Sequence, residues 1–184
     1  MNVAFCIYDD MTALDFVGAY DPITRLDRME FMNLEWDVCA RTETVQSDQL
    51  RFDVDRIAPD LGEYDLVFLP GGYATRDLIH DESFLDWLRT AAPCEYLTSV
   101  CTGSLLLGAA GFLDGKRATT HPNAVDTLAT YAEVDDRRVV RDGNVITGRG
   151  VSSSIDLGLF LVEMLADAET RDAIATQMDY PYGQ

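Results

Sequence analysis

The feature that most constrains the fold is a regular alternation between short apolar runs and segments with helical spacing. Asn2–Tyr8 and Tyr64–Leu69 are typical of buried strands, whereas Leu14–Leu26 carries apolar residues at roughly helical intervals. Strands that alternate with helices form a parallel sheet with helices on both faces, because each connection must cross over the sheet. The sequence therefore predicts an α/β fold, a three-layer sandwich around a mostly parallel central sheet.

The remaining elements are predicted by the same patterns. Asp142-Gly143 is a strong hairpin signal, and Thr42–Ile57 contains short extended pieces that favour a small antiparallel excursion. No repeat, linker or low-complexity segment divides the chain, so we expect a single domain over residues 1–184. We further expect strands at Leu34–Ala40 and Tyr96–Val100, and helices at Ser83–Ala92, Thr102–Ala110, Asn123–Tyr131, near Ser153–Leu165 and at Ala168–Gln177.

The charge balance is unusually acidic and excludes some partners. The net charge is −18, with 23 aspartates against 9 glutamates, and Lys116 is the only lysine among 14 basic residues. Such a field repels phosphates, so neither nucleic acid nor an anionic membrane is expected as a partner. An acidic surface can simply maintain solubility, but the depletion of lysine favours a halophilic, salt-adapted cytoplasm in which salt screens the carboxylates.

No apolar stretch approaches the roughly 20 residues that span a bilayer, and the N-terminus runs directly into a strand pattern. We therefore expect a cytoplasmic protein. The four cysteines, Cys6, Cys39, Cys94 and Cys101, have no metal-like spacing, and the chain has only two histidines. Neither a metal site nor a disulfide framework is predicted.

Cys101 stands at the junction between a predicted strand and a predicted helix, with no loop between them. A residue at such a junction must turn sharply, as the nucleophile of an elbow motif does. A sulfur near a helix N-terminus is close to unpaired amides that favour the thiolate, the nucleophilic form. Most cysteines are only small buried hydrophobes, and that interpretation suits Cys6, Cys39 and Cys94. For Cys101 the position favours a nucleophile.

Three further features follow predicted strands and are ambiguous alone. Gly71 and Gly72 are an ordinary turn or, beside a nucleophile, a place where amides approach an anion. Asp15 either stabilises a helix start or faces the thiol and transfers a proton. His121 is either a base or a turn histidine bonded to backbone.

At Cys101 the chain resembles the ThiJ/PfpI superfamily. Residues 99–121 read SVCTGSLLLGAAGFLDGKRATTH, and the likeness extends to Leu14-Asp15, to Leu69-Pro70-Gly71-Gly72 and to the stretch from Arg138 to Asn144. Within the superfamily, this stretch is most similar to isocyanide (isonitrile) hydratases. The resemblance implies a flavodoxin-like fold, a homodimer, a small-molecule substrate and no cofactor.

The resemblance also implies roles for individual residues. Cys101 would attack the isocyanide carbon to form a thioimidate, and Asp15 would transfer the proton and then activate water, releasing an N-substituted formamide. Thr102, Gly71 and Gly72 would orient the intermediate, and His121 would lie in the substrate site. Peptidase-like members carry histidine where this chain has Thr102, so a Cys-His peptidase is disfavoured.

Several positions depart from the hydratase pattern and put the substrate in question. Pro122 follows the histidine, Tyr73-Ala74-Thr75-Arg76 replaces a glycine-rich loop, and Arg149 interrupts a run of glycines; all are expected to line or support the pocket. Two alternatives remain open. One is a glyoxalase- or deglycase-like enzyme of the same superfamily acting on α-oxoaldehydes, and the other is a non-catalytic redox sensor that uses Cys101.

Overall fold

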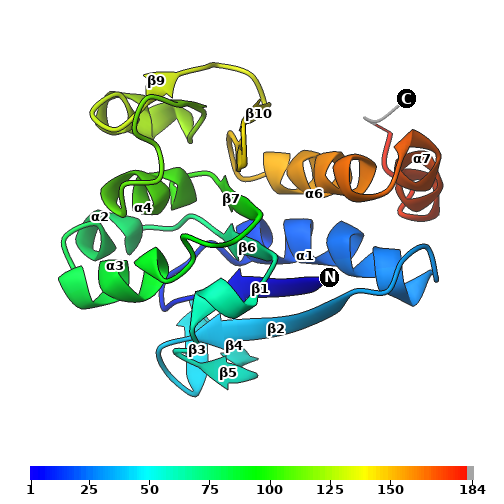
Figure 1. Ribbon diagram of the computed structural model, residues 1–184, viewed down its shortest axis with the longest axis horizontal. Helices are drawn as coiled ribbons and strands as arrows, with labels where there is room; N and C mark the ends of the chain where they lie inside the picture. The colour runs from blue at the N-terminus through cyan, green and yellow to red at the C-terminus, as the bar shows by residue number, and fades with distance from the viewer. Residues whose placement is uncertain (182–184) are drawn as a thin grey trace.

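The computed structural model, which describes residues 1–181, has a seven-stranded sheet at its centre (Figure 1). The strand order is β10-β11-β7-β6-β1-β2-β5, and each neighbouring pair is parallel except β10 and β11, which form an antiparallel hairpin. This is the mostly parallel flavodoxin-like sheet that was predicted. The strands are β1 (Asn2–Cys6), β2 (Glu35–Ala40), β5 (Arg56–Ile57), β6 (Leu66–Leu69), β7 (Tyr96–Val100), β10 (Val139–Asp142) and β11 (Val145–Gly148).

The helices cover both faces because the chain winds outward from β1 in two directions. The connection from β1 to β2 runs toward one edge, and those from β6 to β7 and on to β11 run toward the other. Right-handed crossovers in opposite directions place their helices on opposite faces. Accordingly α1 packs with α6 and α7, while α2 packs with α3 and α4 (Figure 1). The helices are α1 (Ala13–Arg28), α2 (Thr75–Leu78), α3 (Glu82–Arg89), α4 (Gly103–Ala109), α6 (Ser153–Leu165) and α7 (Ala168–Gln177).

Smaller elements decorate this frame. The antiparallel excursion expected within Thr42–Ile57 is present as β3 (Thr44–Ser47) paired with β4 (Leu50–Asp53), but β5 then returns to the main sheet, parallel to β2. A second small sheet joins β8 and β9. The other short elements are η1 (Leu61–Glu63), β8 (Arg117–Ala118), η2 (Pro122–Ala124), α5 (Val125–Leu128) and β9 (Glu133–Val134).

Two details of the helices differ from the prediction. The helix expected over Asn123–Tyr131 is a 3-10 turn followed by the single turn of α5, because the Thr130 hydroxyl bonds to the Thr127 carbonyl at 2.7 Å and competes with the helical pattern. In α6, the helical spacing of Ile155, Leu159, Val162 and Leu165 predicts that all four are buried, but Ile155 and Leu165 are only half-buried. Within residues 1–181, no helix is both long and apolar enough to cross a membrane.

The centre of the sheet gives the functional region a rigid base. Every residue of β6, and every residue of β1 after Asn2, is fully buried, as expected for strands covered on both faces. Strands β7, β6 and β1 are neighbours and parallel, so their carboxyl ends meet at one edge of the sheet. The segments that follow these three strands contain Cys101, Gly71-Gly72 and Asp15, which the topology therefore brings together.

Candidate functional site

Cys101 occupies the sharp turn between β7 and α4 that its position predicted. Its φ of +56° lies in the left-handed region, which costs a non-glycine residue about 1 kcal/mol. Hydrogen bonds hold this backbone: the Cys101 amide donates to the Gly148 carbonyl at 3.0 Å, and its carbonyl accepts from the Thr120 hydroxyl at 3.0 Å. The residue is 5% exposed. The elbow thus fixes a nearly buried sulfur at the edge of the sheet.

Asp15 lies in the first turn of α1 and is completely buried. Its Oδ2 accepts the Gly71 amide proton at 2.9 Å, which ties α1 to the segment after β6. Its Oδ1 accepts no hydrogen bond of usual geometry from residues 1–181. That oxygen is therefore available to the neighbouring Cys101 thiol or to a bound molecule.

The Thr102 hydroxyl closes the other side of the site. It accepts from the Gly72 amide at 3.0 Å and lies 3.1 Å from the Gly72 carbonyl, to which it can donate. Both glycine amides are therefore engaged, Gly71 with Asp15 and Gly72 with Thr102, so in this structure they position those two side chains. A side chain at Gly71 would lie 2.6 Å from the Thr102 nitrogen, which explains why this segment needs glycine.

Burial perturbs the ionisation of both candidate groups. It raises the pKa of the Cys101 thiol to about 12, with a further contribution from the nearby Asp15 charge. It raises the pKa of Asp15 to about 7, although hydrogen bonds from Gly71 and the Cys101 thiol oppose the change. The expectation that the helix N-terminus alone favours the thiolate is therefore wrong: α4 is short, and desolvation and Asp15 outweigh it. The resting pair has a thiol beside a carboxyl that titrates near neutrality.

A cavity of about 150 Å³ opens above Cys101 and Thr102. His121 lines it, and its Nδ1 accepts the Asn123 amide proton at 3.2 Å, as expected of a turn histidine. In the neutral ring, Nε2 is then the donor. Sequence reasoning missed three lining residues that carry no motif, Thr12, Asn123 and Val151. A larger cavity of about 470 Å³, near Trp36 and Arg56, lies at the amino ends of the strands and does not include the cysteine.

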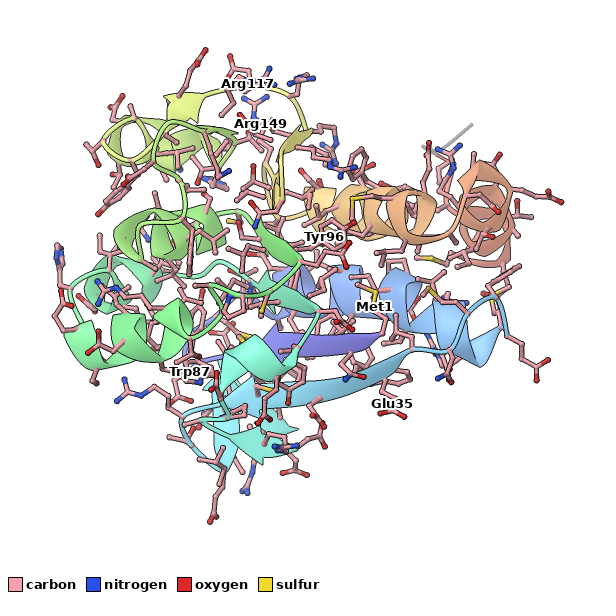
Figure 2. The ribbon with its side chains drawn as sticks, viewed as in Figure 1. Met1, Glu35, Trp87, Tyr96, Arg117 and Arg149 are labelled. Carbon is pink, nitrogen blue, oxygen red and sulfur yellow. The ribbon has the colours of Figure 1, made fainter. Side chains whose placement is uncertain are left out.

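The positions that depart from the hydratase pattern fall into two groups. Tyr73 and Arg76 line the cavity. Arg149 does not line it: its guanidinium donates to the Asp136 carbonyl at 3.1 Å, and Figure 2 shows Arg149 at the β9–β10 end of the molecule. Pro122 begins η2 directly after His121 and is exposed, so it supports the turn but is not part of the lining.

Tyr8 is a buried residue near the site that sequence reasoning did not single out. Its hydroxyl donates to the Pro70 carbonyl at 2.5 Å, immediately before the two glycines. Burial, followed by the charges of Asp15 and Cys101, raises the pKa of this phenol well above its usual value. Its place at the end of the first apolar run was the available signal. Tyr8 holds the peptide that carries the Gly71 amide to Asp15.

The tight packing of Gly72 leads to a stability prediction. Gly72 has a φ of +151°, and an added Cβ would lie 2.5 Å from the Asp10 carbonyl oxygen and 2.6 Å from the Met11 Cα. We expect Gly72→Ala to lower the free energy of unfolding by about 3 kcal/mol, because both strain and overlap must be relieved. Gly150→Ala is the matched control, since its Cβ would meet nothing within 4 Å. Equal urea midpoints for the two variants would contradict the prediction.

The chain is similar to known proteins over most of its length. The family model described as DJ-1/PfpI matches residues 1–164. Isonitrile hydratase from Pseudomonas putida is 38% identical over 183 residues, covering 98% of this chain and 78% of that protein. A solved ThiJ/PfpI family protein from Pseudomonas syringae superposes with a TM-score of 0.88 at 32% identity, covering 98% of this chain and 75% of the other. Drosophila melanogaster DJ-1beta shares the fold, with a TM-score of 0.84 at 23% identity over 98% of both chains.

Proposed function

The chain belongs to the DJ-1/PfpI family, and we propose that it is a cysteine-dependent isonitrile hydratase that converts isocyanides to N-substituted formamides. The observation that carries the proposal is the buried pair of Cys101 and Asp15 beneath a small cavity. A carboxyl whose pKa is about 7 can both accept and return a proton at neutral pH, which is what this reaction requires. The similarity to isonitrile hydratase supports the same chemistry.

In the first step, the Cys101 sulfur attacks the terminal carbon of the isocyanide. Ionised Asp15 takes the thiol proton as the sulfur–carbon bond forms and delivers it to that carbon, giving a thioimidate, Cys101–S–CH=N–R. The high pKa of Cys101 does not prevent this step, because Asp15 removes the proton during the attack and no free thiolate needs to accumulate. Asp15 is ionised again when the step is complete.

In the second step, Asp15 takes a proton from water as its oxygen adds to the thioimidate carbon, and passes that proton to the nitrogen, giving Cys101–S–CH(OH)–NH–R. Ionised Asp15 then takes the hydroxyl proton as the tetrahedral carbon expels the Cys101 sulfur, returns this proton to the sulfur, and R–NH–CHO is released. The Thr102 hydroxyl, which lies within hydrogen-bonding distance of both the amide and the carbonyl of Gly72, orients the intermediate. Overall, one isocyanide and one water molecule give one N-substituted formamide.

The redox-sensor alternative is less well supported. Oxidation of cysteine proceeds through the thiolate, and burial with a nearby carboxylate raises the pKa of Cys101 to about 12. A redox sensor would need a lowered pKa for Cys101. An oxoaldehyde enzyme could use the same pair, so it is tested directly against the hydratase.

The assembly and setting of the enzyme belong to the same proposal. We propose a homodimer of a single domain spanning residues 1–184, of which 182–184 lie outside the described part. Leu14 and Val17 on α1 are 46% and 41% exposed, which supports a partner surface on that helix. Light scattering that gave the mass of one chain would contradict the dimer. The net charge of −18 supports a salt-adapted cytoplasm.

The direct test is formamide production from a small aryl isocyanide, measured by chromatography with purified protein in low salt and in molar KCl. We expect turnover without any added cofactor, and higher activity in KCl if the acidic surface is salt-adapted. Folded protein that leaves the isocyanide unchanged contradicts the proposal. Conversion of methylglyoxal by that same protein would then favour the oxoaldehyde enzyme.

A further inference from the structure

The cavity above Cys101 is unlike the rest of the protein in its charge. The chain has 32 acidic residues, yet none of them lines this cavity. The acids nearest in sequence, Asp10 and Asp77, line a neighbouring cavity of about 380 Å³ instead. Among residues 1–181, the only charged residue in the lining is Arg76, on α2. The carboxyl of Asp15 lies beneath Cys101, is completely buried and accepts the Gly71 amide proton, so it does not line the cavity. A lining with one cation and no carboxylate, in a protein of net charge −18, is suited to an anionic group.

Arg76 is free to bind such a group. Most arginines of this chain form ion pairs with Asp or Glu, but within residues 1–181 no carboxylate lies within 4.0 Å of the Arg76 guanidinium nitrogens. Its guanidinium instead packs over the Tyr73 ring, 5.2 Å from the centroid. This contact leaves the guanidinium N–H groups available for hydrogen bonds. It also restricts the side chain in advance, so less conformational entropy is lost when an anion binds.

The position of Arg76 is tied to the catalytic segment. The preceding residue, Thr75, is buried and donates its hydroxyl to the Gly72 carbonyl at 2.8 Å. Gly72 in turn binds Thr102, next to Cys101. In the same cavity, His121 can donate from Nε2 because its Nδ1 accepts the Asn123 amide proton, and the Asn123 side chain is exposed. The lining therefore offers several donors around one cation, with the thiol beneath.

We propose that the substrate carries a carboxylate, which Arg76 binds while the electrophilic carbon reaches Cys101. The inference rests on the proposed function and names its substrate class: a small isocyanide bearing an acid group, such as isocyanoacetate. Guanidinium binds carboxylate through two parallel hydrogen bonds, a geometry that Lys or a neutral donor does not reproduce. A cavity of about 150 Å³ accommodates a substrate of this small size.

The first test uses alkylation of Cys101, which does not depend on isocyanide turnover. Iodoacetate and iodoacetamide have similar shapes and differ in charge; in both, the sulfur bonds to the methylene carbon and iodide leaves. Rates are read by mass spectrometry of the Cys101 peptide in about 1 M KCl, where the Debye length is about 3 Å and only close contacts remain. We expect Arg76→Gln to lower the iodoacetate-to-iodoacetamide rate ratio about fivefold, through a slower iodoacetate reaction.

Arg141→Gln is the matched control. Arg141 also packs over a tyrosine ring, 6.0 Å from the centroid of Tyr96, and forms no ion pair with a carboxylate of residues 1–181, yet it does not line the cavity. It should leave the rate ratio unchanged although it removes the same charge. An unchanged ratio in Arg76→Gln, or an equal fall in both variants, would overturn the proposal.

A second measurement decides the matter even if both reagents react too slowly. N-formylglycine, the hydration product of isocyanoacetate, should raise the melting temperature of wild type more than N-formylglycinamide does, and Arg76→Gln should remove that difference. Equal shifts in wild type would contradict the carboxylate site. Carboxylate preference without any isocyanide hydration would instead retain the site and refute only the proposed reaction.

Discussion

Formamide production is expected to disappear in Cys101→Ala, with kcat/KM falling by at least about 10³ and the protein still folded. The variant removes the only sulfur in the cavity, so no thioimidate can form. Alanine keeps the backbone hydrogen bonds of Cys101 to Gly148 and Thr120, and its φ of +56° is as strained as that of cysteine. The measurement is product chromatography together with the circular dichroism spectrum.

Cys94→Ala provides the control for this experiment. Cys94 is also buried, but its thiol donates to the Leu61 carbonyl at 3.1 Å and lies outside the cavity. Its loss should reduce stability and leave kcat/KM within about twofold per folded molecule. A Cys101→Ala protein that still produced formamide at the wild-type rate would refute the covalent mechanism.

Asp15→Asn is expected to have two opposite effects, a loss of activity and a gain in stability above neutral pH. Without a carboxylate, proton transfer fails and kcat/KM should fall about 10²- to 10⁴-fold. For wild type, kcat/KM should decline as the pH falls below about 7, because Asp15 must be ionised to accept the thiol proton. A pH–rate profile of wild type and an activity assay of the variant test these expectations.

The stability effect follows from the raised pKa of Asp15. A folded-state value of about 7 exceeds the ordinary value of 3.8, so the folded protein favours the neutral carboxyl. That stability is present in full below about pH 4 and is lost as the pH rises through 7. A tenfold change in proton affinity corresponds to about 1.4 kcal/mol, so above pH 8 the ionised group lowers stability by up to about 4 kcal/mol.

Asparagine keeps an oxygen for the Gly71 amide and carries no charge. We therefore expect Asp15→Asn to be about 1–3 kcal/mol more stable than wild type at pH 8 and no more stable at pH 4, as measured by urea unfolding. Asp114→Asn is the control, because Asp114 is exposed and should show no such pH dependence. A stability difference that did not change with pH would contradict the raised pKa.

The sequence predicted the sheet and the location of the site because both depend on local patterns. Apolar runs identified β1 and β6, and the alternation with helices implied that their carboxyl ends and that of β7 meet. Cys101 could be placed at the elbow because the strand pattern ends at Val100 and the helical pattern begins at Thr102, and in the structure only Cys101 and Thr102 separate β7 from α4. These inferences need only neighbouring residues and the chirality of the crossovers.

The chemistry of the site was harder to predict because it depends on distances through space. The pKa of Cys101 depends on burial and on Asp15, which lies 86 residues earlier in the chain, and neither follows from a helix N-terminus. The bond from Tyr8 to Pro70 likewise joins two strand ends across 62 residues. The burial of individual α6 positions depends on packing against α1 and α7, which the periodicity of one helix does not describe.

The hydrogen bonds around Gly71 and Gly72 also have a consequence for how the protein folds. They join residues 56 and 30 positions apart, at the ends of strands β1, β6 and β7, which are neighbours in the sheet although β2 to β5 lie between β1 and β6 in the chain. Closing such long loops is slow, and the site is complete only when β1, β6 and β7 have all paired. A folding intermediate could therefore hold most of the helices and still lack the site. Recovery of catalysis during refolding should be among the last events, which makes activity a sensitive report of the fully native population.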